Sequence, residues 1–503
     1  MKMSSTSCHA NGTEYTDVIV IGNGPSAICL SYFLSGHRPY YNGLPHSNPY
    51  LHTKLQEIGQ TQTIVDQDLD YLSEGLEGRT TNPVALLFDA LVHPDADMGA
   101  EIPSLLDWKK EEEHAFRHIV LGRGKVGGAW QKMDGSMQTL SLGNWMELPS
   151  VPLKEWRDRK FREGESLDPC SNRATISDVR NYYMDYVANL DLQNHFYDHH
   201  TVTSIQKVYQ VRNGMDLESG EVEPCCNDIA KNHTYLWEVR GYISSADQSF
   251  EDEEDVHRRE FCIQAPHVVV ATGTFDIPNT LNISGEFLPH VIHSLHDFES
   301  ALKSWNEIPR STDDPVLIVG AGLSAADAIL MALNANLPVI HVFRRGANDS
   351  NLIFKKLPQG LYPEYHRIHS LMKGKVVDPL YRPYEKHRLV QIDEDKRVLL
   401  ENTKGNDITT VDVTIAVILI GSRPNLSFLP EEGRSLGVDP QHPINSKNNT
   451  LDVDLFSYES VKHKGLFSMG PLVGDNFVRF GIGGALGVTN YLVKNRKKGN
   501  PCC

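Results

Sequence analysis

The sequence lacks the features of a membrane-embedded, secreted or disulfide-bonded protein. It contains no apolar run of about 18 residues, the length of a membrane-spanning helix, and its first residues include no apolar signal segment. Its eight cysteines form no spaced framework and no CxxC pair, which argues against a disulfide scaffold and against a dithiol redox centre. We therefore expect an intracellular, cytoplasmic and soluble protein.

Basic residues are too few for a nucleic-acid-binding surface. The 503 residues include 48 Lys and Arg against 65 Asp and Glu, which gives a formal net charge of −17. Contacts to phosphate backbones need clustered basic side chains, so nucleic acid is not an expected partner. The 22 histidines form no HExxH motif and no paired metal-ligand spacing, so we expect no metal site.

What the sequence does contain is an alternation of apolar strands with helical segments. Strands are expected at 17–21, 118–121, 267–271, 316–319, 339–343 and 413–420. Near-continuous apolar strands that alternate with helices are typical of parallel sheets covered on both faces, which predicts an α/β fold. One helix is expected at 178–190, with Ser177 as its N-cap.

A large insertion is expected at 37–115, between the first helix and the next strand of the sheet. Its beginning, HRPYYNGLPHSNPY, is rich in Pro, Asn and Tyr, which predicts no regular structure there. Helical segments are expected farther along, at 86–92 and 104–118.

The first strand ends in a glycine turn of the GxGxxA type, made by Gly22, Gly24 and Ala27 with Pro25 and Ser26 between them. Gly22 allows the tight turn, Gly24 lets the backbone approach a pyrophosphate, and Ala27 lets the helix pack closely on the strand. The N-terminus of the following helix offers free N–H groups and a positive dipole end to phosphates. An ordinary glycine turn is the alternative, but the flanking strand and helix favour dinucleotide binding.

A second turn of this type lies between the strand at 316–319 and a helix, and it contains Gly320, Gly322, Ser324 and Ala325. Two such turns in one chain predict two dinucleotide sites. FAD with NADPH is the pairing that makes chemical sense, because hydride passes from the nicotinamide to the flavin.

The strand that closes the second unit ends in Arg344 and Arg345. An Arg where an acid would hold a free 2′-hydroxyl suits a 2′-phosphate, so NADPH is favoured over NADH. The alternative is that both arginines are simply solvated, as surface arginines mostly are.

The corresponding strand of the first unit lacks the acid expected to hold the FAD ribose, because Gly122 occupies its place. Arg123, a backbone group or water would then have to make that contact. Gly127 and Gly128 follow, and two glycines allow the backbone to run close along a ligand. Trp130 is expected to supply a flat apolar wall to the ligand, with a place in the core as the alternative.

The sequence contains, in this order, the segments GNGPSA, GKVGGAW, VVVATGTFDIPN, VGAGLSAAD, LIGSRPNLSFLP and FSMGPLVGDNFVRFGIGGAL. This order resembles the class B flavin-dependent monooxygenases, which have FAD and NADPH domains. Nearly end to end, the chain is similar to the oxidative stress-induced growth inhibitor family. The resemblance implies a two-dinucleotide-binding-domain flavoprotein in which hydride passes from NADPH to FAD and O2 is then activated. It also implies a link to growth regulation and stress response.

The resemblance further implies the domain limits. A discontinuous FAD-binding domain is expected at 14–310 and 405–503, around an inserted NADPH-binding domain at 311–404.

The same resemblance implies further cofactor-binding residues. Thr272 and Gly273 match the strand-end motif where the chain passes between the two domains. Gly470 and Asp475 lie near the segment that approaches the flavin in such proteins. Gly483 would begin the helix whose N-terminus faces the flavin ring and stabilises negative charge there.

One departure from the class B pattern concerns the FxGxxxH fingerprint. Between Phe287 and His293, Pro289 replaces the glycine, and Asp297 stands where an aromatic residue is expected. With the missing ribose acid, this departure supports an alternative function as a catalytically impaired regulatory or protein-interaction scaffold. A third alternative is an NADPH oxidase that releases peroxide. No catalytic side chain is assigned, because flavin chemistry itself needs no nucleophile or acid–base pair.

The C-terminal segment KNRKKGNPCC places basic residues before Cys502 and Cys503. Two lipidated cysteines behind a basic run would anchor the chain to a membrane, although the segment is not a CaaX box. We favour a solvated polar tail, and we expect a small molecule or a protein as the substrate.

Overall fold

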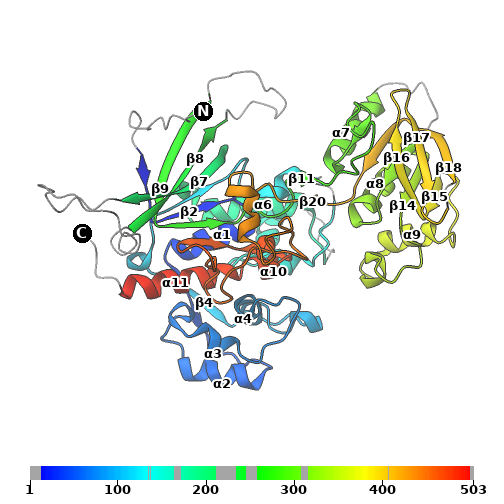
Figure 1. Ribbon diagram of the computed structural model, residues 1–503. Coiled ribbons are helices and arrows are strands. Elements are labelled where there is room, and N and C mark those ends of the chain that lie inside the picture. The colour runs from blue at the N-terminus through cyan, green and yellow to red at the C-terminus, as the bar shows by residue number, and fades with distance from the viewer. Residues whose placement is uncertain are drawn as a thin grey trace, which may run out of the picture. The chain divides into compact units, whose positions relative to one another are not determined.

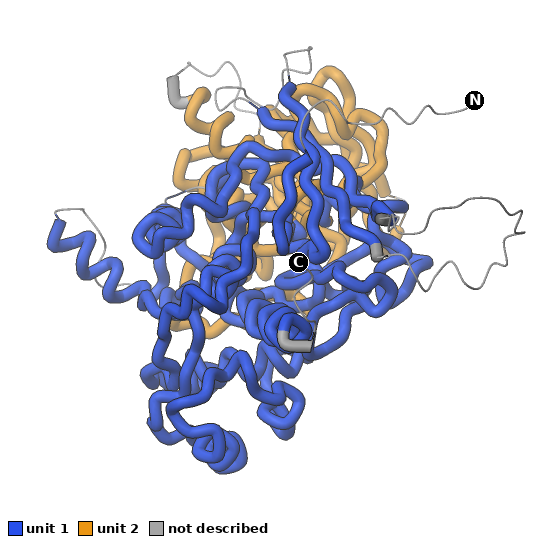
Figure 2. The backbone as a smooth tube through the Cα atoms, turned by 90° about the vertical axis from the view of Figure 1, so that its left-hand side faces the viewer, with its two compact units in different colours: residues 1–274, 424–503 blue, residues 275–423 orange. Residues whose placement is uncertain are grey.

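The computed structural model describes residues 13–133, 135, 137–163, 172–210, 234–244, 258–307, 315–405 and 407–498. The chain divides into two compact units, unit 1 from 1–274 with 424–503 and unit 2 from 275–423 (Figure 2). Among the described residues, no helix is long and apolar enough to cross a membrane. The cysteine pair at 502 and 503 lies outside the described residues.

Unit 1 is built on a five-stranded parallel sheet with the strand order β21-β10-β2-β5-β6 (Figure 1). Its strands are β2 (Val18–Ile21), β5 (His118–Leu121), β6 (Phe196–Tyr197), β10 (His267–Val270) and β21 (Leu466–Ser468). Every residue of β2 and β5 is buried, as expected of parallel strands covered on both faces. These two strands pair directly, with Val18 opposite His118 and Ile21 opposite Leu121.

Helices and a second sheet cover this parallel sheet. The helices of unit 1 outside the insertion are α1 (Pro25–Leu34), α5 (Leu153–Arg162), α6 (Ile176–Asn189), α10 (Val478–Gly481) and α11 (Gly484–Lys498). The second sheet has the order β1-β9-β8-β7 and contains β1 (Glu14–Tyr15), β7 (His200–Gln210), β8 (Thr234–Ile243) and β9 (Arg259–Ala265). One continuous apolar core includes residues of α1, α6, α11 and both sheets.

Helix α6 begins two residues earlier than the sequence suggested. Thr175, and not Ser177, is the N-cap, because its side chain accepts from the Asp178 N–H over 3.0 Å. The Asp178 carboxylate in turn accepts from the Thr175 N–H, which completes a capping box.

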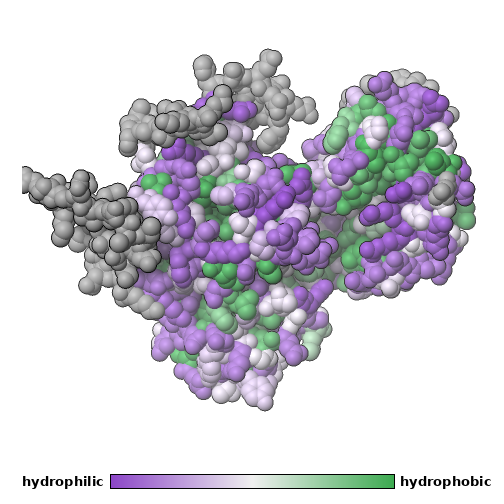
Figure 3. All heavy atoms as spheres, in the orientation of Figure 1, coloured by the Kyte–Doolittle hydropathy of each residue, from purple (hydrophilic) through white to green (hydrophobic). Residues whose placement is uncertain are grey.

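The insertion at 37–115 is more regular than the sequence suggested. It contains β3 (His37–Tyr41), α2 (Pro49–Ile58), α3 (Leu69–Ser73), α4 (Pro83–Val92) and β4 (Leu106–Lys110). The expectation of an irregular start is confirmed for 42–48 and was wrong for 37–41, and the expectation of a helix at 104–118 was wrong. Residues 37–41 and 106–110 pair as the antiparallel strands β3 and β4. The helix expected at 86–92 is present as part of α4. In the view of Figure 3, hydrophilic and hydrophobic residues are interspersed over the insertion.

Unit 2 repeats the plan of unit 1 on a smaller scale. Its parallel sheet has the order β12-β19-β13-β14-β15 and contains β12 (Val291–Ile292), β13 (Val316–Val319), β14 (Val339–Phe343), β15 (Tyr381–Glu385) and β19 (Ile415–Ile418). Its helices are α7 (Leu295–Glu307), α8 (Leu323–Asn334) and α9 (Pro363–Met372). An antiparallel sheet contains β16 (His387–Ile392), β17 (Arg397–Asn402) and β18 (Ile408–Asp412).

Unit 2 is also longer at both ends than the 311–404 expected for the second domain. On the N-terminal side β12 pairs with β19, and on the C-terminal side β18 pairs with β17. A further antiparallel pair, β11 (Ile277–Pro278) with β20 (Ser422–Arg423), joins the two ends of the unit. These pairings place 275–310 and 405–423 in unit 2.

Candidate dinucleotide sites

The first glycine turn passes under the end of the neighbouring strand β10. Gly22 has a φ of 106°, in the left-handed region that favours glycine. A Cβ at this position would overlap the carbonyl oxygen of Ala271, well within 3.0 Å. Glycine is therefore required for the turn to fit at the carboxyl edge of the sheet.

Helix α1 begins at this turn with its N-terminal backbone groups open. Gly24 is the N-cap and gives no side-chain cap, and Pro25 occupies the first helical turn. Among the described residues, no heavy atom lies within 4 Å of a Cβ at Gly24. Ser26 and Ala27 follow as buried residues of the first turn. The free N–H groups and the positive end of the helix dipole thus face open space, where a pyrophosphate fits.

The segment after β5 forms a wall beside this turn. The Gly127 N–H donates to the Asn23 carbonyl over 2.9 Å, and a Cβ on Gly128 would lie 3.1 Å from the Gly24 Cα. These two glycines therefore bring the chain directly against the turn. Trp130 is partly buried in η4 (Gly128–Lys132) and packs against the core of unit 1, which supports the core alternative for this side chain.

Another side chain fills the place of the missing acid. A Cβ on Gly122 would overlap the side-chain amide of Asn23. Asn23 is 5% exposed, and its Nδ2 donates to the Gly124 carbonyl over 2.7 Å. Arg123 directly follows Gly122 in the chain and is partly exposed. Asn23 was missed by sequence analysis, because it stands at a variable position of the GxGxxA pattern.

The ends of β10 and β21 complete the surroundings of the turn. A Cβ on Gly470 would lie 2.7 Å from Ser26 Oγ. Thr272 Oγ1 is buried without a hydrogen-bond partner among the described residues, and next to it Gly273 has no heavy atom of these residues within 4 Å of a Cβ. A buried hydroxyl without a partner costs free energy unless a ligand or water satisfies it. The residues at this edge therefore fit the polar part of a dinucleotide.

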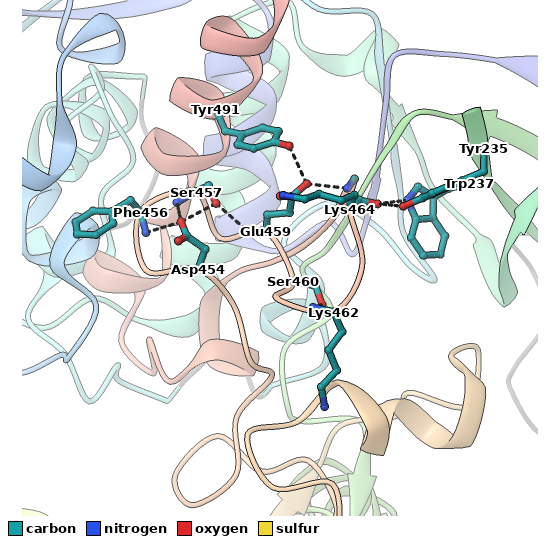
Figure 4. Close-up of polar contacts among 11 residues, drawn as sticks. Tyr235, Trp237, Asp454, Phe456, Ser457, Glu459, Ser460, Lys462, Lys464 and Tyr491 are labelled. Atoms are coloured by element: carbon teal, nitrogen blue, oxygen red, sulfur yellow. Dashed lines mark hydrogen bonds and ion pairs between the residues drawn. The ribbon is translucent and has the colours of Figure 1, made fainter. Parts of the chain in front are cut away.

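A buried glutamate fixes the loop that leads into β21 (Figure 4). Glu459 Oε1 accepts from the Gly465 N–H and from the Tyr491 hydroxyl, each over 2.8 Å, and Oε2 lies 3.1 Å from Lys464 Nζ. The Lys464 carbonyl accepts from Trp237 Nε1 over 3.1 Å. Because Tyr491 belongs to α11 and Trp237 to β8, the loop joins the helix to the second sheet. This arrangement holds β21 in place next to the turn.

The second glycine turn repeats the geometry of the first within unit 2. Gly320 has a φ of 140°, and a Cβ there would overlap the carbonyl oxygen of Leu419 at the end of β19. Gly322 is the N-cap of α8, without a side-chain cap and with no heavy atom of the described residues within 4 Å of a Cβ. Ser324 is exposed and Ala325 is buried in the first turn of α8. Unit 2 thus repeats the arrangement of unit 1, with an uncapped helix N-terminus beside a glycine whose Cβ position is open.

A buried histidine supports this second turn, and sequence analysis did not single it out. His341 Nε2 lies 2.6 Å from the Gly320 carbonyl oxygen, and Nδ1 lies 2.7 Å from the Tyr381 hydroxyl. A carbonyl only accepts, so Nε2 bears the proton and Nδ1 accepts from Tyr381. Burial lowers the pKa of His341 to about 4, which keeps the ring neutral. The signal in the sequence was a polar residue in the middle of the apolar strand VIHVF.

The two arginines expected to select NADPH lie where the sequence placed them. Arg344 and Arg345 directly follow β14 and are both exposed. Beside them, β15 ends at Glu385, which forms an ion pair of 2.7 Å with Lys386. The arginine side chains are thus accessible to a 2′-phosphate at this edge of unit 2.

Asp475 lies away from any open surface. It is 0% exposed, and its carboxylate accepts from the Thr80 hydroxyl over 2.6 Å and from the Tyr458 hydroxyl over 3.2 Å. Burial raises the pKa of Asp475 to about 7. Asp475 contacts the insertion through Thr80, and its cofactor contact stays a prediction.

Gly483 also packs against the insertion. A Cβ at this position would lie 2.6 Å from the Cα of Ala85 in α4. The glycine therefore allows the close approach of α4 to the start of α11, and its contact is with protein.

The degenerate fingerprint forms a small polar cluster within unit 2. His293 Nε2 lies 3.2 Å from Glu286 Oε1, and the His293 ring stacks on Phe287 with centroids 5.8 Å apart. Glu286 also accepts from the N–H groups of Leu281 and Asn282. His293 therefore orders the chain around β12.

The chain is similar over nearly its whole length to growth inhibitor proteins of animals. Oxidative stress-induced growth inhibitor 2 of Homo sapiens is 45% identical over 490 residues, which cover 96% of this chain and 94% of the relative. Oxidative stress-induced growth inhibitor 1 of Mus musculus is 43% identical and covers 98% of both chains.

Family and structure comparisons both agree with the fold. A family model described as pyridine nucleotide-disulphide oxidoreductase matches residues 243–458. The bacillithiol disulfide reductase of Bacillus cereus aligns with a TM-score of 0.55 at 15% identity, over 96% of this chain and 100% of that one. The ornithine hydroxylase of Pseudomonas aeruginosa aligns with a TM-score of 0.53 at 12% identity, over 96% and 100%. The fold is that of an α/β flavoprotein with two dinucleotide-binding domains, as predicted.

Proposed function

Because the chain belongs to the oxidative stress-induced growth inhibitor family, we propose that it is an FAD- and NADPH-dependent oxidoreductase of the monooxygenase type. We assign FAD to unit 1 and NADPH to unit 2. When bound, the two cofactors supply hydride transfer and activation of O2. From the names of its relatives, we extend a role in growth control under oxidative stress to this chain. We also propose a cytoplasmic site of action and a small molecule or protein as the substrate.

The observation that best supports the proposal is the duplicated turn. In each unit a positive-φ glycine lies under a strand-end carbonyl, and a second glycine caps the next helix with open space around its Cβ position. A single turn of this kind would fit one nucleotide, whereas two in separate sheets fit two.

Different groups in the two units bind the two cofactors. In unit 1, the free N–H groups of α1 bind the pyrophosphate, and the Thr272 hydroxyl offers a polar contact beside it. In unit 2, α8 binds the pyrophosphate in the same way, and Arg344 and Arg345 bind the 2′-phosphate. His341 holds the second turn in its binding shape.

The test is the visible absorbance of the purified full-length protein before and after NADPH is added without oxygen. We expect a flavin spectrum that bleaches with NADPH and recovers in air, with a weaker response to NADH. A colourless protein that takes up no added FAD would overturn the assignment and favour the scaffold alternative. Oxygen consumption with and without candidate substrates separates a monooxygenase from an oxidase that only releases peroxide.

A further inference from the structure

In unit 1 the carboxylate that usually holds the adenosine ribose cannot stand at its usual position. That position is Gly122, where any Cβ would overlap the side chain of Asn23. The absence of the acid is therefore built into the packing, since Asn23 is 5% exposed and occupies the space itself.

Asn23 also contacts another carboxylate, that of Asp198, at the same edge of the sheet. Its Nδ2 lies 3.3 Å from Asp198 Oδ1 as well as 2.7 Å from the Gly124 carbonyl. Asp198 directly follows β6, the strand that pairs in parallel with β5. Because the carboxyl ends of parallel strands meet at one edge, Asp198 lies one strand over from the position of the usual acid.

The backbone fixes Asp198 at the level of Gly122. The Gly122 N–H donates to the Tyr197 carbonyl over 3.0 Å, and the His200 N–H donates to the Gly122 carbonyl over 2.8 Å. These two bonds lie on either side of Asp198 in the chain. The carboxylate is thus held beside the glycine turn by main-chain pairing and by Asn23 together.

The Asp198 side chain is suited to binding hydroxyl groups. It is partly exposed, so part of it is open to a ligand. Burial raises the pKa of Asp198, and the hydrogen bond from Asn23 opposes this shift. A carboxylate offers about four acceptor positions; Asn23 and the Val126 backbone use some of them, and the others remain for a ligand.

We propose that Asp198 replaces the missing acid and accepts a hydrogen bond from the 2′-hydroxyl of the adenosine ribose of the dinucleotide in unit 1, with Asn23 as its positioning residue. This inference rests on the proposed binding of FAD to unit 1. It explains how a site without the usual acid can still bind the ribose. Asp198 could not be identified from the sequence, because it is 76 residues from Gly122.

The test compares FAD with 2′-deoxyadenosine FAD on the full-length protein after removal of bound flavin, with flavin fluorescence as the readout. We expect the wild-type protein to prefer FAD by roughly 10- to 100-fold, the value of one hydrogen bond to a charged group. Asp198→Ala should lower the affinity for FAD by that factor and leave the affinity for the deoxy analogue nearly unchanged. Asp198→Asn keeps the volume and an acceptor for Asn23, and it should lose part of the preference. Asp191→Asn, which alters an exposed carboxylate elsewhere in unit 1, is the control and should change neither affinity.

Each other outcome is decisive. If Asp198→Ala weakens both ligands equally, the carboxylate only supports the fold and the inference is wrong. If the wild-type protein binds FAD but does not distinguish the analogue, the inference is wrong while the proposed function stands. If the wild-type protein binds neither, both the inference and the FAD assignment are wrong.

Discussion

Gly22 lies directly beneath the carbonyl oxygen of Ala271, so close that a Cβ would overlap it. Gly320 and Leu419 stand in the same relation in unit 2. In both units the first glycine of the turn therefore serves the fold, because it lets β2 or β13 end under the neighbouring strand.

Substitution of these first glycines should destabilise the protein. Gly22→Ala combines a positive φ with a backbone clash, so we expect it to lower the free energy of unfolding by about 1–3 kcal/mol. Gly320→Ala should do the same in unit 2. Urea unfolding followed by fluorescence measures both changes. Gly99→Ala, at a left-handed position (φ 79°, ψ 15°) with no heavy atom of the described residues within 4 Å, is the control for φ strain alone and should cost less. Equal losses for all three variants would contradict the role of the carbonyl contacts.

The second glycine of each turn should affect binding and not folding. Gly24→Asp places a favoured capping residue at the start of α1, at an extended backbone position that Asp tolerates. Its carboxylate would occupy the phosphate space and repel the pyrophosphate, so we expect unchanged stability and at least a roughly tenfold loss of FAD affinity.

Gly322→Asp is the matched variant in unit 2, at the N-cap of α8. It should weaken NADPH binding and leave FAD binding intact, whereas Gly24→Asp should do the reverse. Fluorescence titrations measure the affinity of each variant for FAD and for NADPH. Loss of the same cofactor in both variants would contradict the assignment of one cofactor to each unit.

The parts of the fold that sequence analysis predicted depend on local patterns. The strands around both turns are short runs of Val, Ile and Leu that are buried on both faces, and GxGxxA places a turn and a helix start within six residues. The strands β3 and β4 could not be predicted in this way, since Tyr40 pairs with Asp107 across the whole insertion. Such pairing at a sheet edge tolerates a proline and overrides local propensity.

In the candidate site, too, only the residues of local motifs could be predicted from the sequence. The turn glycines follow from their motif, but Asn23, Asp198 and His341 act through neighbours far away in the sequence. Asp475 is a related case: the family pattern suggested a flavin contact, and the structure adds Thr80 of the insertion as a partner that no motif indicated. Residues that a motif does not include can be found only once the strands are side by side.

A buried ion-pair network should hold the insertion to the rest of unit 1. Arg479 of α10 has no exposed side-chain surface; its guanidinium lies 3.3 Å from Asp89 and also pairs with Asp97. Arg479→Met would remove the buried guanidinium from Asp89, whose remaining ion-pair partner is His93 at 3.5 Å, and from the more exposed Asp97. Loss of one member of a buried pair typically costs about 3–5 kcal/mol.

Urea unfolding and limited proteolysis of the insertion measure this effect. Arg117→Met is the matched control, because Arg117 pairs with Asp17 over 2.9 Å with 69% of its side chain exposed, and such pairs contribute about 0–1 kcal/mol. The network would have no special role if the two variants lost the same stability, or if protease cut the insertion no faster in Arg479→Met.

Asp475 should make stability depend on pH. Its pKa is about 7 in the folded protein against an ordinary value of 3.8, so between these values the folded state binds a proton that the unfolded state has lost. The contribution of this group to stability therefore falls as the pH rises from about 4 to about 7.

Asp475→Asn should remove this part of the pH dependence and raise the melting temperature at pH 7.5 more than at pH 4.5. FAD affinity should stay at the wild-type value, because the carboxylate faces Thr80 and Tyr458. A loss of FAD affinity at unchanged stability would instead support a direct contact between Asp475 and the cofactor. Asp191→Asn again serves as the exposed control.

His341 should give the opposite pH dependence in unit 2. Burial lowers the pKa of its ring from 6.5 to about 4, so between these values the unfolded state binds a proton that the folded state excludes. The stability due to the neutral ring is complete above pH 6.5 and is lost as the pH falls towards 4. His341→Phe removes this proton linkage and both hydrogen bonds, to Gly320 and from Tyr381.

We expect His341→Phe to lower the free energy of unfolding by about 1–3 kcal/mol at pH 7, because the Gly320 carbonyl loses its donor in a buried site. The difference in the free energy of unfolding between the wild type and His341→Phe should shrink as the pH falls to 4.5. At that pH the buried neutral histidine destabilises the wild-type protein, because the unfolded state binds a proton that the folded state excludes. NADPH affinity should decrease, since the turn is no longer fixed, while FAD affinity should not. His296→Phe, at an exposed position of α7, is the control and should leave the pH profile unchanged. A deficit that stays constant from pH 7 to pH 4.5 would show that His341 is not held neutral beneath the second turn.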